Sequence, residues 1–344
     1  MVPLISIVIP SLNNRRFLEE RIASILNQTL SSWELIIVDN YSDDGAWEFF
    51  QNIARNDDRI RISQAPKEGL YANWNNCIRQ ASGTYVYIAA NDDTMAADFL
   101  EKQVCALEQH PECDLAHCRP RLIDDKGHDA FDWWSGSSIF ARSASGLLGR
   151  THLRLAPFDG FLHLSGESVY LSLTQLLIRR SLFDRIGLFE PRWSSIGDFN
   201  WCMRASLVAN TIHVPDTWGG WRIHPAQATD WAALQLPQHR RMIDEMIEHA
   251  LLSCETNVAP KVRSRWLRCA RDMREFFPAL RLLRTPLRRR IFIGQRLLAG
   301  SWAARHHVKT KISRLEGLPE SAPQVIREWL QSAGIDPVII PGQV

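Results

Sequence analysis

Two adjacent carboxylates, Asp92 and Asp93, follow an apolar run and are the residues best placed to do chemistry. The preceding residues 85–90 are mostly β-branched, aromatic or small, which is typical of a buried strand. Neighbouring carboxylates repel each other unless a proton or a cation separates them. Mg²⁺ is commonly bound by one or two carboxylates together with substrate phosphates. The pair alone would more often cap the helix expected from Ala96, so its role depends on the rest of the chain.

Polar side chains also follow two other predicted strands. Ser11 lies just beyond a strand expected over residues 4–9, and Asp39 ends a strand expected over residues 34–38. In an open α/β sheet, ligands bind in the crevice outside the carboxyl ends of the strands. These positions therefore indicate a nucleotide site. The chain contains neither a GxGxxG motif nor a P-loop motif. The sequence therefore supports neither a dinucleotide-binding fingerprint nor a P-loop.

The elements that must position these residues alternate along the first third of the chain. Short apolar runs indicate buried strands, and apolar residues three or four positions apart indicate helices. Strands that alternate with helices through short turns predict a parallel sheet with helices on both faces. The predicted strands span residues 4–9, 34–38, 59–63, 85–90 and 114–118, and the predicted helices span residues 15–30, 46–54, 70–80 and 96–109.

The remainder of the chain is less regular. Residues 124–165 are rich in Gly, Ser, Trp and His and are expected to form a long, mobile insertion, because loops of that length are usually functional or disordered. Trp133 and Trp134 in this insertion can stack on a sugar or simply pack the loop. A regular pattern returns over residues 169–178 and 179–186. The later elements expected are a helix over 199–209, a strand over 212–214, and mostly helix from 236 onward.

Composition narrows the class of protein. The chain has 344 residues, 45% of them hydrophobic and 23% charged, which is ordinary for a globular protein of one large or two smaller domains. No apolar run approaches the roughly 18 residues of a membrane span, and the N-terminus lacks the features of a signal peptide. The seven cysteines are scattered and form no CxxC site, which favours a reducing cytoplasm.

One segment, residues 261–293, concentrates positive charge. From Lys261 to Arg290, eleven basic residues are opposed only by Asp272 and Glu275. A solvated helical face is one explanation. The other is peripheral contact with an anionic membrane surface, where each nearby Lys or Arg contributes about 1 kcal/mol and the interleaved Leu and Ile side chains can enter the interface. No nucleic-acid-binding module accompanies the charge, so nucleic acid is not an expected partner.

Six stretches between residue 4 and about residue 229 resemble the family 2 glycosyltransferases, which are inverting enzymes of the GT-A fold. They are ISIVIPSLNN, ELIIVDNYSDDG, GLYANWNNCIRQASGTYVYIAANDD, LIRRSLFDRIGLFE, GDFNWCMRA and WRIHPAQAT. The helix with Asn73, Trp74 and Asn75 looks like a variant found in bacterial surface-polysaccharide enzymes. The resemblance implies an α/β GT-A fold, a Rossmann-like mixed sheet flanked by helices. The implied domains are 1–232, with a nucleotide-binding half 1–120 and an acceptor half 121–232, and a basic helical C-terminal extension 233–344.

The resemblance also implies roles for residues at the strand ends. Pro10, Ser11 and Asn13 match positions that line the family's nucleotide pocket, and Asp39 matches the acid that recognises the base, usually uracil. Asp92 and Asp93 match the end of a DxD-type metal motif whose first Asp is replaced here by Ala90 or Asn91. Which carboxylate binds the metal and which faces the ribose stays open. The implied metal ligands are Asp92, Asp93 and His224, and the further nucleotide-sugar contacts are Asn75, Asn91, Asp92 and Arg222.

Asp198 is the implied catalytic base. It falls where the family usually has a Glu–Asp pair, and Gly197 stands in place of the Glu. An inverting displacement needs a base to deprotonate the acceptor hydroxyl, and general-base catalysis typically contributes about 10²–10⁴-fold. The dipole of the following helix would lower the pKa of this carboxyl, whereas burial would raise it.

Together these features predict a cytoplasmic, metal-assisted inverting glycosyltransferase. If the basic segment contacts a membrane, the enzyme is peripheral on its inner face. The expected partners are a nucleotide-diphosphate sugar, with UDP favoured, Mg²⁺ or Mn²⁺, and a glycan or lipid-linked acceptor. One alternative is a sugar-1-phosphate nucleotidyltransferase, against which stands the lack of a Gly-rich loop in PSLNNRR after the first strand. The other is a catalytically inactive GT-A-like binding protein, which the incomplete DxD motif and the missing Glu favour.

Overall fold

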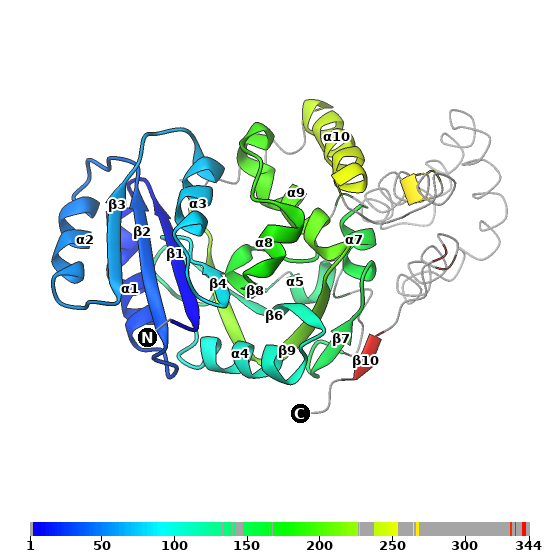
Figure 1. Cartoon of the computed structure of the whole chain (residues 1–344), viewed down its shortest axis with the longest axis horizontal. Coiled ribbons are helices and arrows are strands. Elements are labelled where there is room, and N and C mark those ends of the chain that lie inside the picture. The colour runs from blue at the N-terminus through cyan, green and yellow to red at the C-terminus, as the bar shows by residue number, and fades with distance from the viewer. Residues whose placement is uncertain are drawn as a thin grey trace.

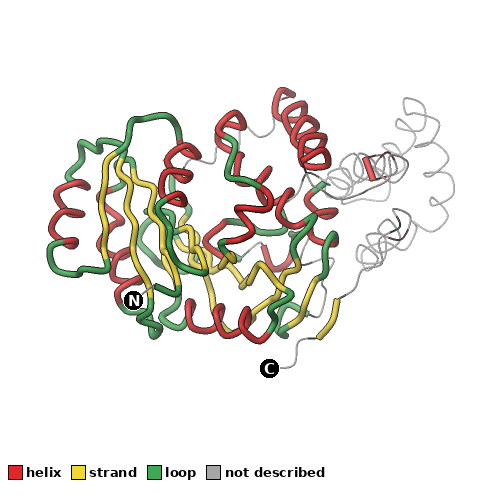
Figure 2. Tube along the Cα trace, viewed as in Figure 1, coloured by secondary structure: helices red, strands yellow, loops and turns green. Residues whose placement is uncertain are grey.

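One large sheet with helices on both faces organises the molecule (Figure 1, Figure 2). Within the described part of the chain, every helix falls short of the length and apolar character that a bilayer span requires. The computed structural model describes residues 3–132, 134–138, 141, 147–164, 166, 168–225, 227, 237–253, 264, 266–267, 331, 334 and 339–341. Most of the basic segment 261–293 and most of the predicted extension 233–344 therefore lie outside the described residues.

The N-terminal half of the sheet is parallel and alternates strands with helices, as the sequence predicts. β1 lies between β2 and β4, and β2 pairs on its other side with β3. The strands are β1 (Ile5–Ser11), β2 (Trp33–Asp39), β3 (Ile60–Gln64) and β4 (Tyr85–Ile88). The helices are η1 (Arg15–Phe17), α1 (Leu18–Leu26), α2 (Ala46–Ala54), α3 (Leu70–Arg79) and α4 (Phe99–Gln109).

The other half of the sheet is mixed. β8 runs antiparallel to both β4 and β6, β6 is parallel to β9, and β9 is antiparallel to β5 and β7. β10 pairs with β7, and the order is β10-β7-β9-β6-β8-β4-β1-β2-β3. Strand direction thus changes at β4, the strand that leads to Asp92. The strands are β5 (Thr94–Met95), β6 (Cys113–Ile123), β7 (His152–Arg154), β8 (Leu176–Arg179), β9 (Asn210–Arg222) and β10 (Ile339–Pro341).

Alternate residues of the strands supply two hydrophobic cores, one on each face of the sheet. Val8 and Ile36 pack in the core with α3, α8 and α9, whereas Ile7 and Leu35 pack in the core with α1, α2 and α4. The later helices are α5 (Trp134–Ser137), α7 (Phe158–His163), η2 (Leu173–Gln175), α8 (Ser181–Ile186), η3 (Pro191–Ile196), α9 (Gly197–Ser206) and α10 (Pro237–Ser253).

The structure differs from the sequence prediction in two places. The short strand expected over 212–214 belongs to the much longer β9, which continues through Gly219. A side chain at Gly219 would overlap the backbone carbonyl of Thr174, so only glycine fits there. The prediction of an irregular insertion over 124–165 was wrong for its described parts, because these include β7 and α7. Trp134 is buried in the core, and Trp133 lies outside the described residues.

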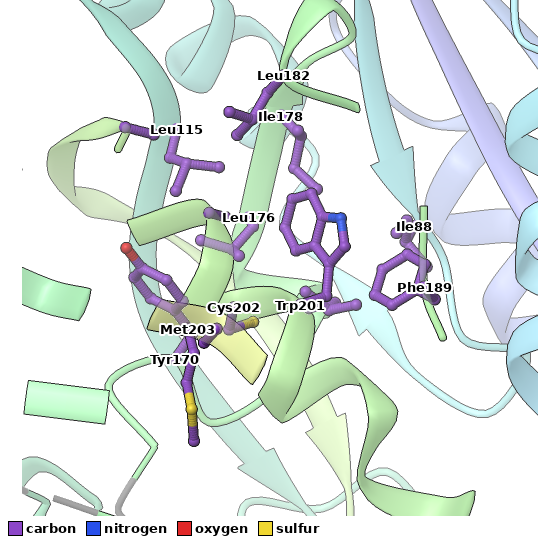
Figure 3. Close-up of a cluster of buried hydrophobic side chains, with 14 of the residues drawn as sticks. Ile88, Leu115, Tyr170, Leu176, Ile178, Leu182, Phe189, Trp201, Cys202 and Met203 are labelled. Carbon is purple, nitrogen blue, oxygen red and sulfur yellow. The ribbon is translucent and has the colours of Figure 1, made fainter. Parts of the chain in front are cut away.

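Trp201 fixes α9 against the sheet. Its ring is fully buried, stacks on Phe183 with ring centroids 4.9 Å apart and lies 5.2 Å from Phe189. Figure 3 shows the indole among aliphatic side chains such as Ile178. Because Trp201 follows Asp198 by about one helical turn, this packing also determines where the Asp198 carboxyl stands.

Four histidines are buried close together in the second half of the fold, and we call His117, His152, His163 and His213 the histidine cluster. The Nδ1 atoms of His117 and His213 are 3.2 Å apart. The Arg154 guanidinium lies 3.0 Å from Nε2 of His152 and 3.4 Å from Nδ1 of His117. Burial lowers the pKa of all four imidazoles, to about 4 for His152 and about 3 for His163.

Candidate active site

The loops that follow β1 and β2 are fastened together at the carboxyl edge of the sheet. The amide of Asn40 donates to the carbonyl of Ser11 at 2.8 Å, and the amide of Asn13 donates to Oγ of Ser42 at 2.7 Å. Asn13 and Tyr41 adopt positive φ angles of 60° and 55°. The structure therefore brings together the two predicted nucleotide-binding loops, which come from separate parts of the sequence.

Asp39 and Ser11 form the buried floor between these loops. Asp39 accepts hydrogen bonds from the amide of Ser42 at 2.9 Å and from its hydroxyl at 2.5 Å. Ser11 is buried, and within the described residues its hydroxyl has no hydrogen-bond partner. Pro10, in β1 beside Val38, completes the strand end. A carboxylate beside an unpartnered hydroxyl is a polar site whose groups can accept a hydrogen bond from a base or ribose, or donate one to it.

Asn91 joins the end of β4 to the loop after β1. Its side-chain oxygen accepts from Nδ2 of Asn14 at 3.1 Å, and its own Nδ2 donates to the carbonyl of Asn13 at 3.4 Å. The predicted nucleotide-binding residues after β1 and β4 are thus in direct contact. Asn91 in this way holds the loop that leads to Asp92 beside the loop after β1.

Asp92 and His224 form the polar pair next to Asn91. Nε2 of His224 lies 2.9 Å from Oδ2 of Asp92, although the two residues are far apart in sequence. Nδ1 of His224 lies 3.3 Å from the guanidinium of Arg16, and both groups pack against the ring of Phe17. The sequence analysis missed Arg16, which is exposed and adds a cation beside the pair. Its position in PSLNNRR, directly after the first strand, was the available signal.

Asp93 points into the protein rather than toward this pair. One of its oxygens accepts from the Thr174 hydroxyl, and the other accepts from the amide of Arg222 at 2.8 Å. Burial raises the pKa of Asp93 to about 7, and the neighbouring Asp92 carboxylate raises it as well. The geometry thus makes Asp93 a support for β9. Thr174 carried no signal in the sequence, because only the fold brings it to the strand end.

The donor set at Asp92 is small. Across the part of the chain that the structure describes, no three His, Cys, Asp or Glu side chains converge on a point where they could hold a metal ion. One carboxylate and one imidazole nevertheless fit a cation whose other ligands are substrate phosphates and water, which is how Mg²⁺ is commonly bound at sites that handle phosphates. Carboxylate oxygens also suit Mn²⁺.

Arg222 is committed to the protein and corrects the prediction of a nucleotide-sugar contact. Its three guanidinium nitrogens donate to the carbonyl of Asp92 at 2.6 Å, the carbonyl of Asp124 at 3.0 Å and Oε2 of Glu20 at 2.6 Å. The side chain is 1% exposed. Arg222 therefore joins the ends of β4, β6 and β9 to α1, and so holds the loop that carries Asp92.

Asn75 also has a different role from the predicted one. Its Nδ2 donates to the carbonyl of Phe189 at 2.8 Å, and its Oδ1 accepts from the amide of Phe189 at 3.0 Å. Both ends of the buried amide thus fasten α3 to the segment before η3. A cavity of about 490 Å³ lies beside this contact, away from Asp92, between α3 and residues 186–191.

Asp198 lies in the first turn of α9 and is half-buried. Its Oδ1 accepts from the Tyr71 hydroxyl at 2.9 Å and from the amide of Phe199 at 2.8 Å. Burial raises the pKa of Asp198 above its ordinary value, while the hydrogen bonds from Tyr71 and Phe199 oppose that rise. A raised pKa makes a carboxylate a stronger base, which suits the removal of a proton from a substrate hydroxyl.

Helix α3 connects Asp198 to the nucleotide-binding loops. Tyr71 in its first turn holds Asp198, and Asn73, two residues later, donates to the carbonyl of Val38 at 2.9 Å and of Ser11 at 3.4 Å. The predicted base and the predicted nucleotide pocket therefore meet the same end of one helix. Tyr71 was not among the residues predicted from the sequence; its place two residues after Gly69, in the first turn of the helix beyond β3, was the available signal.

A family model described as "Glycosyl transferase family 2" matches residues 6–187. A curated relative, the GalNAc(5)-diNAcBac-PP-undecaprenol beta-1,3-glucosyltransferase of Campylobacter jejuni, is 36% identical over 161 residues, which are 46% of this chain and 50% of that protein. In this relative and three further glycosyltransferases, from Bacillus subtilis, the match spans only 34–50% of the relative's length.

Two solved structures share the fold. The crystal structure of Staphylococcus aureus TarS 1–349 in complex with UDP has a TM-score of 0.57 and 16% identity, covering 96% of this chain and 90% of that one. The mannosyltransferase PcManGT from Pyrobaculum calidifontis, in complex with GDP-Man and Mn²⁺, has a TM-score of 0.57 and 17% identity, covering 97% and 86%. At these identities the likeness establishes the fold, the GT-A arrangement of a mixed sheet between helices.

Proposed function

Because the chain belongs to the family 2 glycosyltransferases, we propose that it transfers a sugar from a nucleotide-diphosphate donor to a hydroxyl of a glycan or lipid-linked acceptor. The observation that carries this proposal is the arrangement around the N-terminal end of α3. The polar site at Ser11 and Asp39 and the half-buried carboxyl of Asp198 are linked through this one helix. An enzyme that joins a nucleotide sugar to an acceptor needs both a donor pocket and a base.

The donor half of the proposed reaction uses the loops at the strand ends. Ser11, Asn13, Asp39 and Asn91 would contact the base and ribose. Asp92 and His224, in contact at 2.9 Å, would hold Mg²⁺ or Mn²⁺. When bound, such an ion supplies positive charge that stabilises the departing diphosphate. Arg16 beside His224 would add a second positive group near the phosphates.

The acceptor half of the reaction uses Asp198 as the base. In an inverting displacement the acceptor oxygen attacks the anomeric carbon from the face opposite the diphosphate. The carboxylate of Asp198 takes the hydroxyl proton as the new glycosidic bond forms and the bond to the diphosphate breaks. Donation by Tyr71 and by the amide of Phe199 keeps this carboxylate oriented.

We favour a UDP-sugar donor and an acceptor from a bacterial surface glycan. The names of two comparison proteins support this direction: TarS binds UDP, and the Campylobacter relative acts on an undecaprenol-linked glycan. We further propose a GT-A domain over 1–232, divided near residue 120, and an extension over 233–344. A cytoplasmic enzyme that meets its acceptor at the inner membrane face, through the basic residues 261–293, would be consistent with such an acceptor.

The first experiment is calorimetric titration of the full chain with UDP, GDP and dTDP, with and without Mn²⁺. We expect one diphosphate to bind in a metal-dependent way, and binding to be lost in Asp92→Ala but retained in the exposed control Asp125→Ala. Transfer with the matching sugar nucleotide should then vanish in Asp198→Asn while diphosphate binding stays unchanged. Pyrophosphate release from a nucleoside triphosphate and a sugar 1-phosphate would instead indicate a nucleotidyltransferase, and binding without turnover an inactive binding protein.

A further inference from the structure

We propose that Tyr71 is a positioning residue for Asp198, and that Gly197 provides the space that its ring requires. This inference rests on the proposed function, since Asp198 is the proposed base. Tyr71 is almost fully buried, and its hydroxyl lies 2.9 Å from Oδ1 of Asp198 and 3.1 Å from the carbonyl of Ser195. No other side chain among the described residues donates a hydrogen bond to Asp198.

The ring of Tyr71 is held by its neighbours, so its hydroxyl has a fixed position. It stacks on Phe189 with centroids 5.8 Å apart and meets Trp74 edge-on at 5.2 Å. A Cβ on Gly197 would lie 2.6–2.7 Å from two carbons of this ring. Any side chain at position 197 would therefore displace the ring and move its hydroxyl away from Asp198. Gly197, which stands in place of an acidic residue, is thus the residue that leaves room for the Tyr71 ring.

Both hydrogen bonds to Asp198 end on the same oxygen. The Tyr71 hydroxyl and the amide of Phe199 donate to Oδ1, and the described residues make no hydrogen bond to Oδ2. Oδ1 is therefore the anchored atom, and Oδ2 is the atom available to take a proton from an acceptor hydroxyl. Charge-assisted hydrogen bonds of this kind are shorter and stronger than neutral ones, so they orient the carboxylate well.

Tyr71 can serve Asp198 before and after proton transfer. A hydroxyl has one proton, so it donates to a single acceptor at a time. While Asp198 is ionised, its negative charge makes Oδ1 the better acceptor. Once Asp198 carries the proton, the Tyr71 proton can turn to the carbonyl of Ser195, 3.1 Å away. Burial raises the pKa of Tyr71 well above its ordinary value, so the hydroxyl stays a donor at neutral pH.

The test is Tyr71→Phe in the full chain, which keeps the ring and removes only the hydroxyl. Loss of a donor to the charged form should raise the titration midpoint of Asp198 by about one pH unit, equivalent to a tenfold weaker acid. The midpoint is read from the ¹³C resonance of the labelled Asp198 carboxyl, identified by its absence in Asp198→Asn. The same shift should appear in the acid limb of kcat, with kcat lowered about tenfold and the donor KM unchanged.

Tyr170→Phe is the matched control. Tyr170 is also buried and donates to a carboxylate, Oδ2 of Asp159, at 2.8 Å, but it lies in the histidine cluster region. This variant should lose stability without moving the Asp198 midpoint. An unchanged midpoint in Tyr71→Phe would overturn the inference, whatever the activity. If Tyr71→Phe shifts the midpoint but the wild-type protein transfers no sugar, the role of Tyr71 is upheld and the proposed function is rejected.

Discussion

Lowering the pH from 7 to 5 should destabilise this protein through its histidine cluster. The folded state keeps His117, His152, His163 and His213 neutral, because burial lowers the pKa of each below its ordinary value of about 6.5. In the unfolded chain these imidazoles take up protons as the pH falls through 6.5. The unfolded state thus binds more protons, and the stability present above pH 6.5 is lost on acidification.

Two carboxyls act in the opposite direction. The pKa of Asp93, about 7, and that of Asp198 are raised by burial, so the folded state holds protons there that the unfolded state releases. Against the four protons that favour the unfolded state, Asp93 holds one in the folded state, and Asp198 adds at most one more. The net is therefore two to three protons. Each proton changes the free energy of unfolding by about 1.4 kcal/mol per pH unit. Between pH 6 and pH 5 we therefore expect a loss of roughly 2–4 kcal/mol, a large share of the typical 5–15 kcal/mol.

Urea unfolding followed by tryptophan fluorescence at pH 7, 6 and 5 measures this loss. His163→Gln removes one buried imidazole and should reduce the pH slope by about 1.4 kcal/mol per unit. His128→Gln, whose histidine side chain is 75% exposed, is the control and should leave the slope unchanged. Equal stability at pH 7 and pH 5, or the same slope in wild type and His163→Gln, would refute the reasoning.

Three further predictions concern the site and its supports. Gly197→Ala should lower kcat about tenfold or more in a transfer assay, because its Cβ would lie 2.6 Å from the Tyr71 ring. Arg222→Lys should cost about 2–4 kcal/mol of unfolding free energy in urea, since an ammonium cannot reproduce three directed hydrogen bonds. Asn75→Ala should cost about 1–3 kcal/mol by leaving the backbone of Phe189 unpaired, while calorimetry finds the affinity for the nucleoside diphosphate unchanged.

Specific results would contradict these three predictions. Wild-type kcat in Gly197→Ala would mean that the Tyr71 ring has no fixed position. An Arg222→Lys protein as stable as wild type would mean that the guanidinium contacts are dispensable. Weaker diphosphate binding in a stable Asn75→Ala protein would mean that Asn75 does contact the nucleotide, as the sequence predicted. Asn76→Ala, one residue away on the same helix and only half-buried, is a suitable control for the last case.

The sequence was informative where function depends on local pattern. Short apolar runs that end on polar residues predicted the parallel strands, and the rule that ligands bind at carboxyl ends brought Ser11, Asp39 and Asp92 to one edge. The structure confirms this half of the fold. Local pattern failed for β9, which continues through Gly219 and Gly220. The close passage of the Thr174 backbone requires glycine at position 219, and Thr94 leaves no room for a side chain at position 220.

Motif matches located residues better than they assigned their contacts. Arg222 and Asn75 lie in matched motifs, yet their polar atoms are already used by the protein's own backbone. A sequence cannot show which donors are already engaged, because their partners, such as Asp124 and Phe189, come from distant segments. Tyr71 was missed for the same reason: its partner Asp198 is 127 positions away in the chain.

The pairing of β10 with β7 has a consequence for how the chain is made. Ile339 pairs with Arg154 and is synthesised 185 residues later. At typical translation rates of about 5–20 residues per second, the outer edge of β7 waits roughly 10–40 s for its partner. An unpaired strand edge is a template for other strands, so this interval is when the nascent chain is most exposed to wrong pairing. The outer edge of β7 therefore needs protection during synthesis, before β10 is available to cover it.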